Sequence, residues 1–170
     1  MASVKEDVLS ALGALGVSYE LLEHAPVHTM EDCKAAEEAL GGVMPKNLFL
    51  TPRNHASHHL LIARAEAPFR TSRVSRQLGV SRLSFATAEE LMDMLRTLPG
   101  AISPMGLLFD GEKKVRLAID RELRGEERLL FHPCVNTATL AISGADFFGR
   151  LLPALGHEAV YVDMEGEDAE

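Results

Sequence analysis

Short apolar segments alternate with helical segments along this chain, and two pairs of apolar segments are separated only by a turn. The first pair is 46–50 with 59–63, around a turn at Asn54, and the second is 107–109 with 115–119, around Asp110-Gly111. Such hairpins break a strictly parallel pattern. We therefore expect an α/β protein with one mixed, curved and partly barrel-like sheet and with helices packed outside it.

The remaining elements follow from apolar periodicity and from capping residues. We predict helices over 4–16, 71–78, 88–97 and 145–155. A further helix is expected to begin at a cap formed by Thr29 and Asp32 and to end at Leu40. Further strands are expected at 17–24, 84–86, 129–131, 137–142 and 159–162. Segment 99–106 contains two prolines and two glycines, so it is expected to form a loop.

Composition is that of an ordinary globular protein, with 170 residues, 46% hydrophobic side chains and a net charge of −8. No apolar run approaches the roughly 18–20 residues of a membrane span, and the first residues do not resemble a signal peptide. Two cysteines are too few for a disulfide framework. We expect a cytoplasmic protein with one domain over 1–162 and a disordered acidic tail over 163–170.

Charge is distributed unevenly along the chain. Residues 53–82 contain six arginines and one acid, whereas residues 1–40 carry a net charge of −6. An acidic protein is a poor general binder of DNA or RNA, but a local basic segment permits one contact with a phosphate backbone. The alternative interpretation is that these arginines lie on an exposed helix face and pair with the acidic N-terminal third.

Common catalytic and cofactor motifs are absent, including GxGxxG, the Walker loop, HExxH and GxSxG. His55, His58 and His59 lie beside a turn with no carboxylate or thiolate near them in the sequence, so they are interpreted as surface histidines. Cys134 is interpreted as a buried structural thiol, because no flanking residue would lower its pKa. We predict no metal and no cofactor.

Three segments are not easily explained by local packing. Lys46-Asn47 places a cation and an amide at the start of an apolar strand. Segment 100–104 combines a glycine, which lets a ligand approach the backbone closely, with a proline that stiffens the loop. Segment 131–137 is a tight turn bounded by His132 and Asn136.

Four sequence segments together resemble a known family. They are "KNLFL" at 46–50, "RLSFA" at 82–86, "PGAISPMGLLFD" at 99–110 and "LLFHPCVNTATLAIS" at 129–143. This combination is similar to the aminoacyl-tRNA editing domains of the YbaK/prolyl-tRNA synthetase insertion superfamily, and among them to the free-standing prolyl-tRNA deacylases of the PrdX or ProXp-ala type. The resemblance extends from about residue 8 to residue 162. His28 and Cys33 depart from the pattern of the family.

The resemblance implies a function and a set of residue roles. Such proteins hydrolyse the ester of a mischarged tRNA, here Ala-tRNA(Pro), without a metal, and a ribose hydroxyl of the substrate would help to activate the water. Lys46, Gly100 and His132 would then be catalytic. The substrate-binding residues would be Thr29, Met30, Asn47, Ala101, Ile102, Ser103, Pro104 and Asn136, and the tRNA-binding residues would be Arg70, Arg73 and Arg82.

The expected partners are the acceptor end of tRNA(Pro) and, beyond it, prolyl-tRNA synthetase, but neither DNA nor a membrane. Three alternatives stay open at this point. The chain could deacylate another mischarged product, such as a cysteinyl- or seryl-tRNA. It could bind aminoacyl ends or a synthetase without turnover. A serine hydrolase using Ser103 and His132 is the third, although Ser103 does not lie on a nucleophile elbow.

Overall fold

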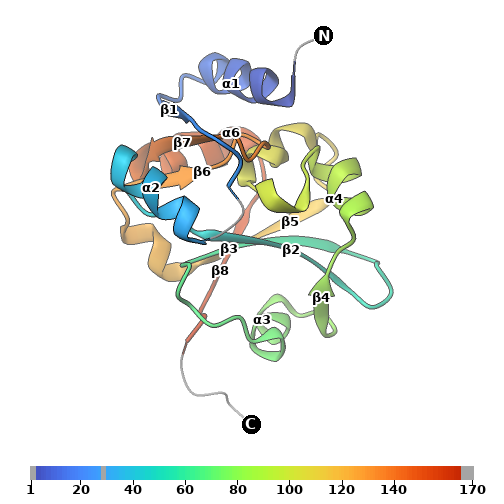
Figure 1. The fold of residues 1–170 in the computed structure, drawn as a ribbon. Coiled ribbons are helices and arrows are strands. Elements are labelled where there is room, and N and C mark those ends of the chain that lie inside the picture. Colours follow the sequence, from blue (N-terminus) through green and yellow to red (C-terminus); the bar gives the residue numbers. More distant parts are fainter. Residues whose placement is uncertain (1–2, 28–29, 166–170) are drawn as a thin grey trace.

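A computed structural model of the chain describes residues 3–27 and 30–165 (Figure 1). Its helices of the α type are α1 (Val4–Ala14), α2 (Met30–Leu40), α3 (Thr71–Leu78), α4 (Ala88–Leu95), α5 (Gly144–Asp146) and α6 (Leu152–Leu155). Its strands are β1 (Glu20–Glu23), β2 (Lys46–Pro52), β3 (His58–Ala63), β4 (Leu83–Phe85), β5 (Val115–Asp120), β6 (Arg128–Phe131), β7 (Ala138–Ser143) and β8 (Ala159–Val162). Other short helices are η1 (Pro99–Ala101), η2 (Pro104–Phe109), η3 (Arg121–Gly125) and η4 (Phe147–Leu151).

The larger sheet has the strand order β4-β2-β3-β5-β8 and crosses the middle of the molecule (Figure 1). The predicted hairpin of β2 and β3 is confirmed, with Lys46 opposite Ala63 and Leu50 opposite His59. Strands β5 and β8 are added in parallel, which makes the sheet mixed. Alternate side chains of β3 enter two separate apolar clusters, one on each face, so the sheet is buried on both sides.

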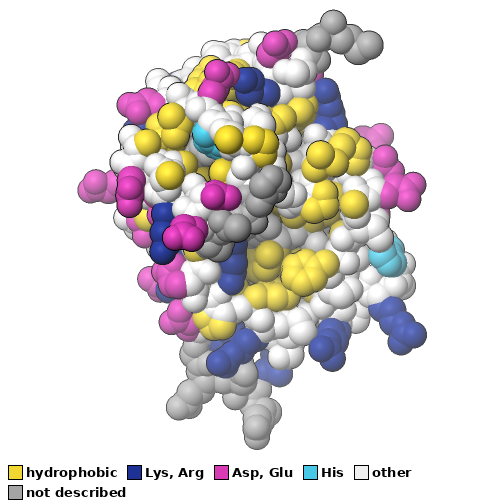
Figure 2. Space-filling model, viewed as in Figure 1, with side chains coloured by type: hydrophobic (Ala, Val, Ile, Leu, Met, Phe, Trp, Pro, Cys, Tyr) yellow, Lys and Arg dark blue, Asp and Glu magenta, His cyan; other side chains and the backbone are white. Residues whose placement is uncertain are grey.

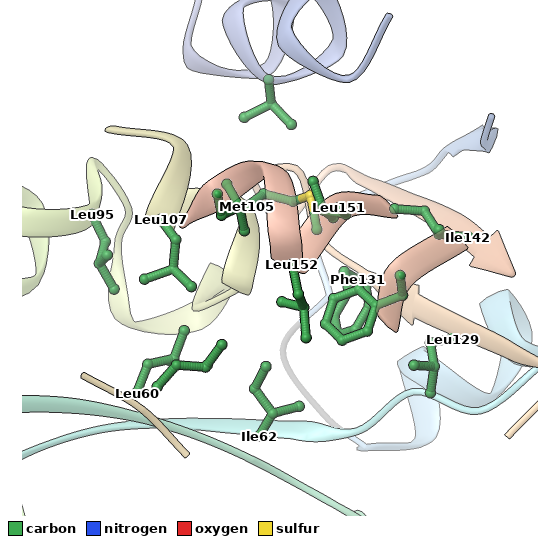
Figure 3. Packing of buried hydrophobic residues seen from close by; sticks show 14 of the residues in the cluster. Leu60, Ile62, Leu95, Met105, Leu107, Leu129, Phe131, Ile142, Leu151 and Leu152 are labelled. Carbon is green, nitrogen blue, oxygen red and sulfur yellow. The ribbon is translucent and has the colours of Figure 1, made fainter. Parts of the chain in front are cut away.

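The smaller sheet has the order β1-β7-β6 and lies with α1 and α6 above the larger sheet, whereas α3 lies below it (Figure 1). Between the two sheets, Leu60 and Ile62 of β3 point toward Phe131 and Leu152 (Figure 3). Phe131 stacks on Phe147 with ring centroids 4.9 Å apart. The mixed α/β class is confirmed, but the described strands form two sheets and neither closes into a barrel.

The predicted hairpin around Asp110-Gly111 is wrong. Residues 104–109 form the helix η2, and β5 pairs in parallel with β3 instead. Gly106 explains why η2 packs tightly, because a Cβ there would lie 2.7 Å from the Cβ of Leu95 in α4. The Asp110 carboxylate accepts hydrogen bonds from the backbone N–H groups of Lys114 and Val115, which closes the turn before β5.

Two further segments differ from expectation. The helix predicted over 145–155 contains a π-helical stretch at η4, between α5 and α6. The predicted tail begins with ordered residues, because Met164 is buried and Asp163 pairs with Arg121 at 3.1 Å. None of the described helices is long and apolar enough to cross a membrane.

Candidate functional site

A cavity of about 150 Å³ lies where α2, the start of β2, η1 and the end of β6 meet. Its wall therefore brings together segments that are far apart in the sequence. The lining residues are Cys33, Glu37, Met44, Pro45, Lys46, Asn47, Pro99, Gly100, Ile102, Leu130, Phe131 and His132. Five of the residues singled out from the sequence are among them: Lys46, Asn47, Gly100, Ile102 and His132.

Lys46 supplies a cation at the edge of this cavity. It is the first residue of β2, and its side chain is half-buried. The ammonium group donates a hydrogen bond to the backbone carbonyl of Ala67, in the segment between β3 and α3. An ammonium carries three N–H donors, so this bond fixes the position of the charge and leaves further donors for a ligand.

Asn47 supplies a buried acceptor. Its Nδ2 donates to the carbonyl oxygen of Pro45 at 3.4 Å, which assigns the orientation of the amide. The Oδ1 atom is then buried and receives no hydrogen bond from any of the described residues. Burying an acceptor without a partner costs about 1–3 kcal/mol. A ligand that brings an N–H or O–H group into the cavity would remove that cost.

His132 supplies an unprotonated nitrogen. Its Nδ1 donates to the carbonyl oxygen of Ala138 at 2.9 Å, which leaves the lone pair on Nε2. Burial, together with the nearby His24, lowers the pKa of His132, although the bond to Ala138 opposes this shift. The ring is therefore neutral at pH 7 and can accept a hydrogen bond from a water or a hydroxyl group.

His24 holds the His132 ring in place and was not predicted from the sequence. The two rings meet edge to face, with centroids 6.3 Å apart. His24 is itself fixed, because Nδ1 donates to the carbonyl of Ala25 at 2.8 Å and Nε2 lies 2.8 Å from the hydroxyl of the buried Thr139. Its position just after β1 gave no local signal, since the contact with Thr139 spans 115 residues of sequence.

Gly100 joins this cavity to a second, more apolar one of about 430 Å³. The second cavity is lined by Leu98, Gly100, Ala101, Cys134, Val135, Asn136 and Thr137. A Cβ at Gly100 would come no closer than 3.9 Å to the Nδ2 of Asn136, so the fold itself does not require glycine there. Asn136 donates through Nδ2 to the carbonyl of Val27 at 3.3 Å.

The other predicted substrate-binding residues lie elsewhere or are not described. Ser103 is fully buried, and its hydroxyl accepts from the N–H of Met105, so it caps η2. Ser103 and Pro104 line neither cavity, which removes the geometric basis for a serine hydrolase using Ser103 with His132. Thr29 lies outside the described residues. Met30 begins α2, but its side chain is not among those described.

The three predicted tRNA-binding arginines lie below the larger sheet, around α3 and β4. Arg70 and Arg82 are exposed. Arg73 donates to the backbone carbonyls of Asp163 and Glu165, at 2.9 and 2.8 Å, and so holds the chain that follows β8. From the same basic segment, Arg64 pairs with Asp120 at 2.8 Å, not with the acidic N-terminal third.

Cys134 is buried, as interpreted from the sequence, and burial raises the pKa of its thiol to about 12. The thiol therefore stays protonated and is a poor nucleophile. The histidine cluster differs from the expectation in two respects. Glu90 of α4 accepts hydrogen bonds from both His55 and His58, and the ligand atoms of these three residues lie within 4.8 Å of one another. His59 is buried, not exposed.

Several cavity residues were not predicted from the sequence, foremost Cys33 and Glu37 of α2. Their spacing of four residues places them on one face of the helix, but no local pattern shows which part of the molecule that face covers. Around this small space the site combines the cation of Lys46, the unpaired acceptor of Asn47 and the neutral imidazole of His132. Such a site can hold a small ligand that donates a hydrogen bond to the Asn47 oxygen and carries negative charge near Lys46.

Comparisons with known proteins place the chain in a family. The family model for the aminoacyl-tRNA editing domain matches residues 24–149. The chain is 32% identical over 142 residues to the prolyl-tRNA editing protein ProX of Acetoanaerobium sticklandii, covering 84% of this chain and 87% of that protein. It is 30% identical to the prolyl-tRNA synthetase associated domain-containing protein 1 of Danio rerio, covering 95% and 88%. The solved structure of hypothetical protein APE2540 has the same fold, with a TM-score of 0.73, 18% identity and coverage of 92% and 99%.

Proposed function

Because the chain belongs to the aminoacyl-tRNA editing domain family, we propose that it is a trans-editing deacylase that hydrolyses the ester of mischarged tRNA(Pro), with alanine as the wrong amino acid. One similar protein is a prolyl-tRNA editing protein, which supports tRNA(Pro) as the substrate. A synthetase pocket built for proline cannot strongly exclude the smaller alanine, so a second, hydrolytic site is useful.

One observation carries the proposal: Lys46, Asn47 and His132 border the same 150 Å³ cavity. The space suits a short side chain such as that of alanine. The unpaired Oδ1 of Asn47 would accept a hydrogen bond from the α-ammonium group of the amino acid. Lys46 would bind the terminal adenosine or its phosphate and stabilise negative charge that develops near the ester.

The reaction requires only water, because an aminoacyl ester is already activated. The water oxygen bonds to the ester carbonyl carbon, and the bond from that carbon to the ribose oxygen breaks. The ribose oxygen leaves as a hydroxyl group after taking up a proton that the attacking water releases. The neutral His132 would orient the water, and the backbone of 100–102 would hold the ester. A neighbouring ribose hydroxyl of the substrate would assist the proton transfer.

The test compares alanyl-, cysteinyl-, seryl- and prolyl-tRNA(Pro) in single-turnover hydrolysis with the purified chain. We expect Ala-tRNA(Pro) to be hydrolysed at least ten times faster than Pro-tRNA(Pro), and we expect a chelator to leave the rate unchanged. Hydrolysis of the cysteinyl or seryl ester faster than that of the alanyl ester would show that the preferred substrate is that other mischarged tRNA. Binding of the charged tRNA without turnover would reject the enzyme and leave a binding module.

The partners follow from the same proposal. The acceptor end of tRNA(Pro) is the substrate, and prolyl-tRNA synthetase is the enzyme whose error is corrected, in the cytoplasm where aminoacylation takes place. Co-purification with the synthetase at physiological salt tests whether the two proteins associate stably.

A further inference from the structure

The most exposed large hydrophobic side chain among the described residues lies on the same face as the basic segment. Phe85 is 64% exposed and ends β4, at the edge of the larger sheet, where it lies opposite Leu50 of β2. An aromatic ring exposed on an edge strand is a liability for aggregation unless it has a partner. Where other apolar side chains adjoin it, such a residue is a candidate docking surface.

Phe85 is part of a small apolar surface. Its ring lies 6.1 Å from that of Phe69, with a tilt of 50° between the two planes. Phe69 and Leu48 are half-buried and pack on the apolar cluster below the larger sheet. The three side chains form what we term the aromatic platform: Phe69, Phe85 and Leu48. Figure 2 shows hydrophobic side chains gathered in the middle of this face.

The aromatic platform lies on the same face of β2 as Lys46, which borders the candidate active site. Leu48 follows Lys46 by two residues in β2, so the two side chains point to the same face of the sheet. The ammonium of Lys46 is bound to the carbonyl of Ala67, two residues before Phe69. Lys46, Leu48 and Leu50 therefore share one face of β2, and Phe85 lies opposite Leu50 on the neighbouring strand.

Positive charge borders the other side of the aromatic platform. Arg82 lies just before β4, and Arg70 follows Phe69; both are exposed. Figure 2 shows a row of Lys and Arg side chains along the lower border of the hydrophobic patch. On a chain whose net charge is −8, this local excess of cations is complementary to a polyanion such as the phosphate backbone of RNA.

We propose that the aromatic platform binds unpaired bases at the 3′ end of the RNA, which stack on Phe85 and Phe69 while Arg82 and Arg70 contact the phosphates. This inference rests on the proposed function for the direction of the strand, with its terminal residue at Lys46. Base–aromatic stacking accepts any base, so the platform binds single-stranded RNA without reading its sequence. It would hold the strand while the acyl group enters the cavity.

The test uses uncharged RNA, so that it does not depend on hydrolysis. Two hairpins reproduce the acceptor stem, one with a single-stranded ACCA 3′ overhang and one with a blunt end, and their dissociation constants are measured by fluorescence anisotropy. Phe85→Ala should weaken binding of the overhang hairpin about tenfold and leave the blunt hairpin unchanged. Phe85→Trp should bind the overhang hairpin about as tightly as the unchanged protein does. Val160→Ala, at an exposed hydrophobic residue on the opposite edge strand β8, should change neither.

Three results would overturn the platform: no preference of the unchanged protein for the overhang, equal affinities of Phe85→Ala and the unchanged protein, or equal losses on both hairpins. If Phe85→Ala changes only the oligomeric state, the surface is an interface between copies. An unchanged protein that binds the overhang through Phe85 but hydrolyses no aminoacyl-tRNA would reject the proposed function and keep the platform. If the protein hydrolyses aminoacyl-tRNA but Phe85→Ala does not weaken binding of the overhang hairpin, the platform is rejected and the proposed function is kept.

Discussion

The amide oxygen of Asn47 is buried by the fold and receives no hydrogen bond from the described residues. We expect Asn47→Leu to raise the free energy of unfolding by about 1 kcal/mol, because an unsatisfied acceptor is removed. Hydrolysis of Ala-tRNA(Pro) should fall at least tenfold, because the α-ammonium loses its acceptor. Urea denaturation and single-turnover kinetics measure the two effects.

Asn54→Leu is the matched control for this change. Asn54 is exposed, and its Oδ1 accepts from the N–H of Ala56 at 3.0 Å, so its replacement should lower stability slightly and leave hydrolysis unchanged. A loss of stability in Asn47→Leu, with full activity retained, would mean that Asn47 has only a structural role.

His132 gives a prediction for the pH dependence of the reaction. Its pKa is lowered by burial and by His24, so the ring gains a proton only below the usual value of about 6.5. The contribution of His132 to the hydrolysis rate should therefore be constant above pH 6.5 and be lost as the pH falls through the lowered pKa. We expect His132→Asn to be slower and to lack this inflection. If the inflection in the pH–rate profile persists in His132→Asn, the titrating group is not His132.

Single residues of the site were the most predictable part of the chain. Lys46, Asn47, Gly100 and His132 lie in segments that local packing does not explain, their roles were implied by the family resemblance, and the structure places them on one cavity. Glu37 and His24 were not predicted. Their roles depend on contacts with distant segments, and a charged residue on a helix or a histidine after a strand is common without any function.

Strand β3 carries a buried histidine that makes folding sensitive to acid. Burial, with Arg116 and His58, lowers the pKa of His59 to about 4. Between pH 6.5 and pH 4 the unfolded chain binds a proton that the folded chain excludes, so stability falls as the pH falls. From pH 6.5 to pH 5, the unchanged protein should lose about 1.5 kcal/mol more than His59→Gln, measured by urea denaturation. Equal losses in the two proteins would contradict this assignment.

Elements with strong local signals were predicted well, and those fixed by distant contacts were not. The hairpin of β2 with β3 and the helix expected from residue 88 are confirmed, and Thr87 and Glu90 form a capping box at the start of that helix, α4. A second capping box, Ser3 with Glu6 at α1, was not predicted, although it is also local in sequence. The segment 107–115 has the sequence of a hairpin. It forms a helix and a turn instead, because the Asp110 carboxylate accepts hydrogen bonds from two backbone N–H groups and Gly106 lets η2 pack closely on α4.

The molecule as a whole is acidic, but Arg70 and Arg82 are exposed around α3 and β4, so we expect the salt dependence of tRNA binding to originate there. We expect Arg82→Glu to weaken binding of tRNA(Pro) and to flatten the slope of log affinity against log salt by about one unit per lost phosphate contact. Arg116→Glu makes the same change in net charge on an exposed position of β5 and should leave the slope unchanged. Equal slopes for Arg82→Glu and the unchanged protein would exclude Arg82 from the interface.

The α/β class was predictable at the scale of the whole chain, but the division into two sheets was not. Strand β1 pairs with β7, so that Glu20 lies opposite Ala141. No turn sets such a register, which depends on how two distant apolar surfaces fit together. The cavity forms at the junction of these segments, which is why the sequence predicted its residues better than its shape.

The most direct test of the account is single-turnover hydrolysis of Ala-tRNA(Pro) by Lys46→Ala, with Lys114→Ala as the control at an exposed lysine that pairs with Glu112. Circular dichroism should show that both variants are folded. We predict that Lys46→Ala loses at least a hundredfold in rate, whereas Lys114→Ala retains the rate of the unchanged protein. A folded Lys46→Ala variant with full activity would contradict the account.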